Sequence, residues 1–383
     1  MMKINKKLSI VAVAVLATFQ AQADIRINGF ANLTTGITTE DTNLFGTTED
    51  IDFSNDSLFA IQFSGDISDK WMATAQVIAR GSNDYSAEFE WAYLTYTASD
   101  NSEIIAGRFR LPVFRYSASL DVGYSYHWIE APQTVYDVAF NNINGIRYDY
   151  TNYSGDFEYV LQFSYGNYED EIGGGINKAK DVVLASFEGN MSNIKGRIVW
   201  GRGENQFSQG ALDAALASIS EISPVLADEL AIDGDEGVFL GFGLEYDNFD
   251  WFVSAEYTTI DIEDSFSPKD TAYYVTAGTR LGKFTPHITY QERDGRGDVR
   301  FQESVNVLPE PFRTVVTGIN AGLQSSFFEE YSMITVGMRY DIATNVALKA
   351  EYTSYDNKID VAEANPEDAV DTDVIKFSVN YVF

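Results

Sequence analysis

The chain has 383 residues, and its 57 Asp and Glu outnumber its 26 Lys and Arg, which gives a formal charge of −31. A strongly acidic chain repels phosphate groups, so nucleic acid is excluded as a partner. Apolar residues make up 45% of the chain and aromatic residues 14%, which is far more buriable surface than a disordered chain carries. The chain has no Cys and only two His, which rules out disulfides, thiolate nucleophiles and Cys-ligated zinc. We therefore expect a folded protein that is not an enzyme and that needs no cofactor or metal.

The first 23 residues have the pattern of a cleaved secretory signal. Three Lys in the first seven residues precede an apolar run of twelve, Leu8 to Phe19, and Ala21-Gln22-Ala23 follows as a small-x-small cleavage site. The alternative is a membrane anchor, but a spanning helix needs ~20 apolar residues. We expect cleavage after Ala23, so that residues 1–23 are the signal peptide and residues 24–383 are the exported chain.

Beyond Asp24 the apolar residues alternate with polar ones, which is the period of a β-strand. The end of the chain shows this best. One face of that segment carries Ile375, Phe377, Val379, Tyr381 and Phe383, and the other carries Lys376, Ser378, Asn380 and Val382. The same split recurs over 251–258 and 334–341. One face of each segment suits lipid and the other suits water, although a soluble sandwich would also alternate.

The spacing of the segments decides between these two classes. Short and long connections take turns along the chain, as in membrane barrels with tight turns at one end and longer loops at the other. Seven turns are expected near 68–70, 99–101, 154–156, 192–193, 247–248, 281–283 and 342–344. Eight loops are expected at 40–56, 82–86, 111–142, 167–179, 204–236, 262–270, 294–330 and 357–372. The pattern predicts an all-β, antiparallel, up-and-down transmembrane barrel of about sixteen strands.

Two stretches outside these strands have their own patterns. Residues 212–230 place apolar side chains at helical spacing and are interrupted by Pro224, so we expect one short helix at the barrel mouth. The stretch from Arg313 to Asn320 could itself be extended, which leaves the strand count open by two.

The chain resembles the general porins of Gram-negative bacteria. The resemblance rests on the expected signal, a first strand Asp24–Phe30, sixteen hairpin-paired segments, and a C-terminal Tyr381-Val382-Phe383. It implies an outer-membrane channel for passive diffusion of ions and small hydrophilic solutes, a homotrimer, and recognition of Phe383 by the barrel-assembly machinery. In that family the long third loop, which here follows Gly107–Pro112, folds into the lumen and narrows it. The Pro-Glu-Phe-Gly-Gly tip of enterobacterial members is absent, so the geometry of the narrowing does not follow from the resemblance.

An inward third loop is expected from its composition as well. Residues 111–142 contain seven aromatic residues: Phe114, Tyr116, Tyr124, Tyr126, Trp128, Tyr136 and Phe140. This apolar area is too large to leave in water. We expect the loop to pack on the inner barrel wall. The alternatives are that it caps a neighbouring subunit, or that its rings form a stacking platform for sugars.

The basic residues indicate how such a channel would sort solutes. With the apolar face of each strand assigned to lipid, eleven basic residues are expected to face the lumen: Arg26, Arg80, Arg108, Arg110, Arg147, Lys195, Arg197, Arg280, Arg339, Lys349 and Lys376. Arg80, Arg108, Arg110 and Arg147 would lie beside the third loop. That loop carries Asp121, Glu130 and Asp137, so we expect opposite charges to face each other across the narrowest section and to sort solutes by size, charge and dipole.

The first and last long loops carry much of the acidic excess. Their carboxylates are Glu40, Asp41, Glu49, Asp50, Asp52 and Asp56, and Asp360, Glu363, Glu367, Asp368, Asp371 and Asp373. They could bridge to lipopolysaccharide through divalent cations, or form a solvated acidic surface. Neither loop has the spacing of a dedicated calcium site.

Three other functions compete with a general channel. A substrate-selective channel for sugar or anion is a close variant, and a surface adhesin or receptor with a plugged lumen is a second. An enzyme would need a hydrolytic constellation. The best material for one is His127 with Ser125 and Asp121, because His287 lies on a strand with no nucleophile paired to it.

Overall fold

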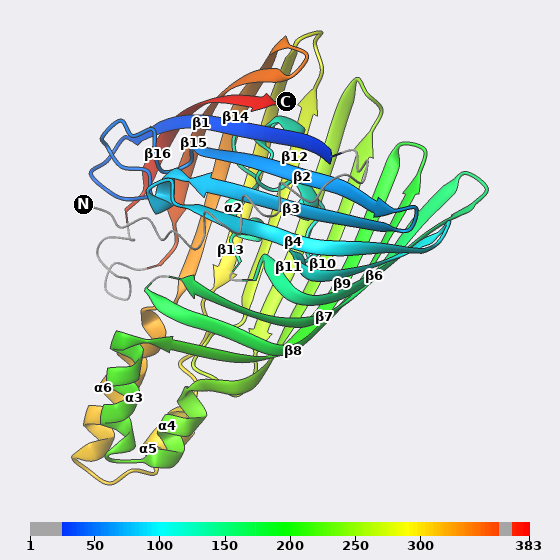
Figure 1. The fold of residues 1–383 in the computed structure, drawn as a ribbon. Helices are drawn as coiled ribbons and strands as arrows, with labels where there is room; N and C mark the ends of the chain where they lie inside the picture. The colour runs from blue at the N-terminus through cyan, green and yellow to red at the C-terminus, as the bar shows by residue number, and fades with distance from the viewer. Residues whose placement is uncertain (1–24, 139, 173, 360–369) are drawn as a thin grey trace, which may run out of the picture.

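The computed structural model of the protein describes residues 25–138, 140–172, 174–359 and 370–383. Within them, sixteen strands form one closed barrel in which each strand pairs antiparallel with its sequence neighbours and β16 pairs with β1 (Figure 1). The first eight strands are β1 (Ile25–Thr38), β2 (Leu58–Ser68), β3 (Trp71–Arg80), β4 (Ala87–Ser99), β5 (Ser102–Arg110), β6 (Asn142–Ser154), β7 (Phe157–Ile172) and β8 (Gly175–Met191). The second eight are β9 (Ile194–Gln209), β10 (Ile232–Asp247), β11 (Trp251–Ile262), β12 (Asp270–Thr279), β13 (Phe284–Gly295), β14 (Glu329–Ala343), β15 (Val346–Asn357) and β16 (Thr372–Val382). The predicted sixteen-stranded barrel is confirmed, and the predicted signal peptide lies outside the described residues.

The alternation of side chains follows the predicted register over most of the wall. On β14, Ile334 and Val336 are about half exposed on the outer face, whereas Thr335 between them is buried. On β16, Phe377 and Val379 face outward and Ser378 faces inward. Among the described residues, none of the helices combines the length and the apolar character that crossing a bilayer requires.

The barrel closes between its first and last strands. Their backbones pair from Phe30↔Val382 to Thr38↔Val374. Beyond β16, the N–H of Phe383 donates to the carbonyl of Gly29 and the N–H of Gly29 donates to Phe383, both at 2.9 Å. The Phe383 ring stacks on Phe59 of β2 at 6.1 Å between centroids. Closure satisfies backbone groups for which lipid offers no partner.

The connections agree with the prediction except in three places and at the ends of the predicted loop over 204–236, where β9 continues to Gln209 and β10 begins at Ile232. The seven short turns lie at or next to their predicted positions. The predicted loop over 167–179 is wrong, because β7 and β8 continue as a hairpin to Ile172 and Gly175. Buried Tyr168 and Ala179 continue the inward alternation there, so the segment extends the wall.

The other two differences concern helices. Residues 210–231 form α3 (Gly210–Ser220) and α4 (Pro224–Leu230) instead of one short helix. Pro224 begins α4, because proline fits the first turn, and the Ser223 side chain caps it by accepting from the N–H of Leu226. Arg313–Asn320 is not extended but lies in α6 (Phe312–Ser325), which buries Val316, Asn320 and Leu323 at helical spacing.

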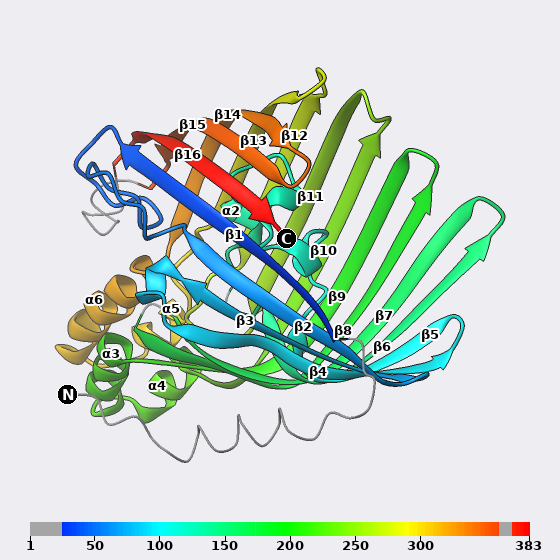
Figure 2. The same cartoon turned by 45° about the horizontal axis from the view of Figure 1, so that its top comes forward.

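The helices α3, α4, α5 (Gln302–Asn306) and α6 form a small lobe outside the barrel. Its apolar centre is built from Leu212, Ile219, Leu226, Val305 and Val316. Both views show the lobe beyond the strand ends that carry the long loops, away from the short turns (Figures 1 and 2). The lobe therefore does not fill the interior of the barrel, which is occupied by another segment.

We expect deletion of Phe383 to lower the amount of folded barrel recovered from membranes. The deletion removes two backbone hydrogen bonds to Gly29, each worth about 0.5–1.5 kcal/mol net, as well as the stacked ring. The heat-modifiable fraction on a gel measures the folded barrel. Phe249→Ala, in the exposed turn between β10 and β11, is the matched control. A wild-type folded fraction in the deletion would show that closure does not depend on Phe383.

Candidate functional site

The loop that joins β5 to β6, residues 111–141 and called loop 3 here, folds into the lumen. It contains η2 (Ser117–Ser119), η3 (Gly123–Ser125) and α2 (Gln133–Tyr136). The helix α2 contacts β11, β12 and β13 and lies inside the ring of strands (Figure 2). The predicted inward fold of the third loop is confirmed.

The aromatic residues of loop 3 account for much of this packing. Four of them are at most 6% exposed: Phe114, Tyr126, Trp128 and Tyr136. The Trp128 ring meets Tyr274 of β12 edge-on at 5.5 Å, and its Nε1 donates to Thr289 Oγ1 at 2.8 Å. These rings therefore pack on the inner wall, as expected, and are not free to stack on a sugar.

Two cationic side chains of the wall hold the loop by its backbone. The Arg339 guanidinium donates to two loop carbonyls, at 2.6 and 2.8 Å, and Lys349 Nζ donates to two others. The four acceptors belong to Gly123, Tyr124, Tyr126 and Trp128. Buried carbonyls need such partners, so these contacts replace the water that the loop loses in the lumen.

Loop 3 approaches the seam of the barrel at Gly123. A Cβ at this position would lie 2.5 Å from Asn380 Nδ2 and 2.7 Å from Asn32 Oδ1. Asn32 Nδ2 also donates to the carbonyl of Asp121 at 2.9 Å. Only glycine leaves room for this approach, so the loop crosses from β5 to the seam between β1 and β16.

A cluster of four charged side chains joins loop 3 to β3, β4 and β5. This ion-pair cluster consists of Arg80, Glu90, Arg110 and Asp121. Arg80 contacts Glu90 at 2.7 Å and Asp121 at 3.1 Å, and Arg110 contacts Glu90 at 2.6 Å and also Asp121. Burial opposes ionisation of Asp121, but Arg110 and Arg80 outweigh it and hold the pKa of this carboxyl below its ordinary value.

Most of the charges predicted to face each other across a gap are in ion pairs instead. Besides the ion-pair cluster, Glu130 of loop 3 pairs with Lys376 at 2.8 Å. Arg147 pairs with Asp149 on its own strand at 2.9 Å. Asp137 is exposed, and no basic residue among those described pairs with it.

The predicted inward orientation of Arg108 is wrong. Paired residues of an antiparallel ladder share a face, and Arg108 pairs with Ala92 and Asn144, which are both exposed. Ile105 and Phe109, whose apolar character suggested the lipid face, are instead buried in the lumen against loop 3. Arg110 reaches the lumen at the end of β5, where the chain leaves the wall.

Loop 3 separates cavities on its two sides. On the side of the long loops, a cavity of about 380 Å³ is lined by Asp56, Asp121, Glu130 and Asp137, among others. On the side of the short turns, cavities of about 350 and 550 Å³ both reach Trp91 and Ala118. Asp121 lines the first cavity and Arg110 lines the 350 Å³ one. The ion-pair cluster therefore lies between the two sides.

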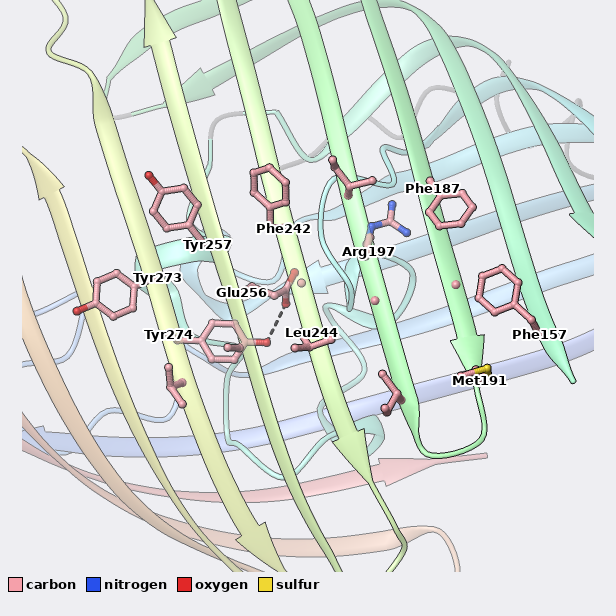
Figure 3. A pocket seen from close by; sticks show the side chains of 17 residues that line it. Phe157, Phe187, Met191, Arg197, Phe242, Leu244, Glu256, Tyr257, Tyr273 and Tyr274 are labelled. Carbon is pink, nitrogen blue, oxygen red and sulfur yellow. Dashed lines mark hydrogen bonds between the residues drawn. The ribbon is translucent and has the colours of Figure 1, made fainter.

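A further groove, of about 730 Å³, lies along the wall formed by β7 to β12 (Figure 3). Its outward-facing lining is apolar and includes Phe187, Met191, Phe242 and Leu244. Glu256 behind it accepts a hydrogen bond from Tyr274 at 2.8 Å (Figure 3). The groove faces outward, so we place the functional site in the lumen.

Glu256 is also an anchor of loop 3. Its carboxylate accepts from the hydroxyl of Tyr136 and, at 3.0 Å, from the N–H of Arg115. Glu351 of β15 likewise accepts from the N–H of Ile129 at 2.8 Å. The sequence did not single out these carboxylates, although alternation had placed Glu256 on the lumen side of its strand.

The histidine constellation does not form a hydrolytic site. His127 Nε2 bonds to Thr276 Oγ1 at 3.2 Å, and its ring lies 4.7 Å from that of His287. Ser125 Oγ donates to the carbonyl of Ser119, and Asp121 belongs to the ion-pair cluster. The three side chains therefore serve loop packing.

A sequence model of the Gram-negative porin family matches residues 9–383. No curated protein matches the chain. Several solved structures have a similar fold. The anion-selective porin from Comamonas acidovorans is 11% identical, with a TM-score of 0.59 over 94% of this chain and 100% of its own. OmpF of Salmonella typhi, in complex with daunomycin, is 13% identical, with a TM-score of 0.57 over 94% and 97%. The trimer form of OmpT, an outer membrane protein of Vibrio cholerae, is 11% identical, with a TM-score of 0.55 over 94% and 99%.

At these identities the solved structures show a similar fold and nothing more, whereas the family match spans nearly the whole chain. The protein belongs to the family of Gram-negative porins, and it is a passive channel of the outer membrane.

Proposed function

We propose that ions and small hydrophilic solutes pass this porin through a constriction at the ion-pair cluster, where loop 3 meets the wall of β3 to β5. Arg80, Arg110 and Asp121 would line its narrowest part, with Arg147 on the periplasmic side and Glu130 and Asp137 on the outer side. The observation that carries the proposal is that Asp121 lines the cavity on the outer side of loop 3, Arg110 lines one on the periplasmic side, and these two side chains form an ion pair. Arg108 is left out because of its outward register.

The pairing of charges points to a preference for cations. Arg80, Arg110, Arg147 and Lys376 each contact a carboxylate, so little positive charge remains to attract anions. Asp137 is exposed in the outer cavity, and the chain carries a large acidic excess. Charges in a narrow, water-poor section act on permeating ions more strongly than loop charges that bulk electrolyte screens within ~10 Å at 0.1 M salt.

We expect Arg80→Ser to raise the cation-to-anion permeability ratio about two- to fivefold, because one charge near the ion path is worth at most about 1 kcal/mol in water. Asp121 and Glu90 keep Arg110 as a partner, which protects the fold. The zero-current potential in a salt gradient measures the ratio. Arg26→Ser, which removes an exposed Arg paired with Asp66, is the matched control. If both variants shift the potential equally, the cluster is not at the constriction.

The cation preference should also fall as the pH drops from 8 to 6. Burial and repulsion from Glu130 raise the pKa of Asp56 to about 7, even though Lys376 opposes the shift. Asp56 therefore takes up a proton in this window and removes one negative charge from the outer cavity. Burial lowers the pKa of His127 well below its usual value, so His127 stays neutral. Zero-current potentials of wild type and Asp56→Asn test this: the variant should show a flatter pH dependence, and an equal dependence in both would contradict the assignment.

Several further features are part of the proposal. The trimer form of the structurally similar OmpT supports a homotrimer. We expect the signal to be removed after Ala23, and the barrel-assembly machinery to read the strand that ends at Phe383. Lipid would cover the apolar outer wall. Divalent cations would bridge the outermost acidic loop residues to lipopolysaccharide. Asp56 is excluded from that set because its side chain is largely buried and pairs with Lys376, and the carboxylates of residues 360–369 lie outside the described part of the chain.

Three other candidates fit the site less well. A sugar-selective channel would need free aromatic faces, but the loop 3 rings named above are buried. An anion-selective channel would need cationic groups without carboxylate partners at the constriction. An adhesin or receptor with a closed lumen would conduct no ions, which a planar-bilayer recording distinguishes directly.

A further inference from the structure

A second loop also enters the mouth of the barrel. Loop 1, residues 39–57, joins β1 to β2, and its tip reaches β14 and β15. Leu44 and Thr47 exchange both backbone hydrogen bonds at 2.9 Å, which forms a tight turn with Phe45 at its corner. The Phe45 ring lies 5.8 Å from the ring of Tyr331 and 6.4 Å from that of Tyr355. Both tyrosines are buried, so the loop spans the width of three strands and ends in an aromatic contact.

The middle of loop 1 lies on the inward face of β1. The backbones of Gly36 and Asp52 form an isolated bridge. A Cβ on Gly36 would lie 3.2 Å from the Thr47 methyl group and 2.8 Å from Cγ of the inward-facing Lys376. Thr47 is itself buried. The loop therefore fills part of the lumen, and the missing side chain at Gly36 makes room for it.

One cation connects loop 1 with loop 3. Lys376 Nζ lies 2.6 Å from Asp56 of loop 1 and 2.8 Å from Glu130 of loop 3. The side chains of Asp56 and Lys376 are largely withdrawn from water, and that of Glu130 is partly exposed. Because a buried charge needs its partners, this arrangement fixes the spacing between the two loops.

The space between the loops is the outer cavity of about 380 Å³. Loop 1 contributes Phe45 and Asp56 to its lining, and loop 3 contributes Tyr126, Glu130 and Asp137. A solute that reaches loop 3 by way of this cavity has already passed the tip of loop 1.

We infer that loop 1 forms a second, outer constriction in series with loop 3, held in place by Phe45 and presenting Phe45 and Asp56 to the passing solute. The inference rests on the proposed role of loop 3 as the inner constriction. Two narrow sections in series add their resistances, so the wider one becomes visible when the narrower one is removed.

The test compares single-channel conductance in four proteins: wild type, Phe45→Ala, a deletion of residues 116–128 in loop 3, and the combination. Phe45→Ala removes the ring contacts with Tyr331 and Tyr355, so the tip of loop 1 should leave the mouth. We expect a conductance at least about 1.5-fold higher than wild type, and a larger factor in the loop 3 deletion. Phe45→Tyr keeps the aromatic contact and should conduct like wild type. Phe312→Ala, an exposed ring on α6, controls for loss of an aromatic residue at the same end of the barrel.

The outcomes separate the two claims. If Phe45→Ala leaves conductance unchanged in both backgrounds, loop 1 does not narrow the path, whatever the loop 3 deletion does. If the loop 3 deletion alone has no effect while Phe45→Ala raises conductance, loop 1 is the main constriction and the role proposed for loop 3 fails. Heat-modifiability confirms that each variant is a folded barrel. An equal rise in Phe45→Ala and Phe45→Tyr would also overturn the inference, because the aromatic contact would then not hold the loop.

Discussion

A backbone segment that enters the lumen of a barrel loses the water that satisfied its carbonyl and amide groups, and the wall must replace that water. In this porin the replacement comes from basic and acidic side chains of the wall. Arg339 and Lys349 donate to loop 3 carbonyls, and Glu256 and Glu351 accept from loop 3 amides. The position of loop 3, and therefore the shape of the ion path, depends on basic and acidic wall residues that need not contact a solute.

The same use of charge shapes the electrostatics of the channel. Basic side chains that are bonded to loop carbonyls or paired with carboxylates attract anions only weakly. Exposed Asp137, by contrast, lines the outer cavity. Lys376 illustrates both roles, since it pairs with both Asp56 and Glu130 and thereby links two loops. Mechanical anchoring and ion selectivity consequently share residues, and a substitution at Lys376 would change both at once.

The fold could be read largely from the sequence because alternation and turn residues are local signals. They located all sixteen strands and the seven turns, and the aromatic content of loop 3 indicated that it would be buried. The misplaced features depend on tertiary contacts. The strand pattern assigns Ile105 and Phe109 to the lipid face, but in the structure they face the lumen and loop 3 covers them. Arg108, on the opposite face of β5, therefore points outward. Helix α6 is stabilised by its contacts with the other helices of the lobe, which no strand pattern could reveal.

The candidate site was predictable as a set of residue types but not as an arrangement. Arg80, Arg110 and Asp121 were expected near the constriction, but their direct contact depends on where Gly123 lets the loop meet the seam. Glu90, which lies opposite a break in the register between β3 and β4, supplies a buried partner that the strand pattern did not mark. In the sequence, loop 1 stood out only by its acidic residues. The role of its aromatic tip becomes visible only in the structure, where Phe45 contacts Tyr331 and Tyr355.

Because the chain has no Cys, a single introduced cysteine can report directly whether the ion path runs beside loop 3. Ala118 is exposed and lines both cavities on the periplasmic side of the loop. In Ala118→Cys, attachment of a charged thiol reagent should lower the single-channel current, and anionic and cationic reagents should shift the zero-current potential in opposite directions. Complete modification, verified by mass, with no change in current or potential would contradict the account.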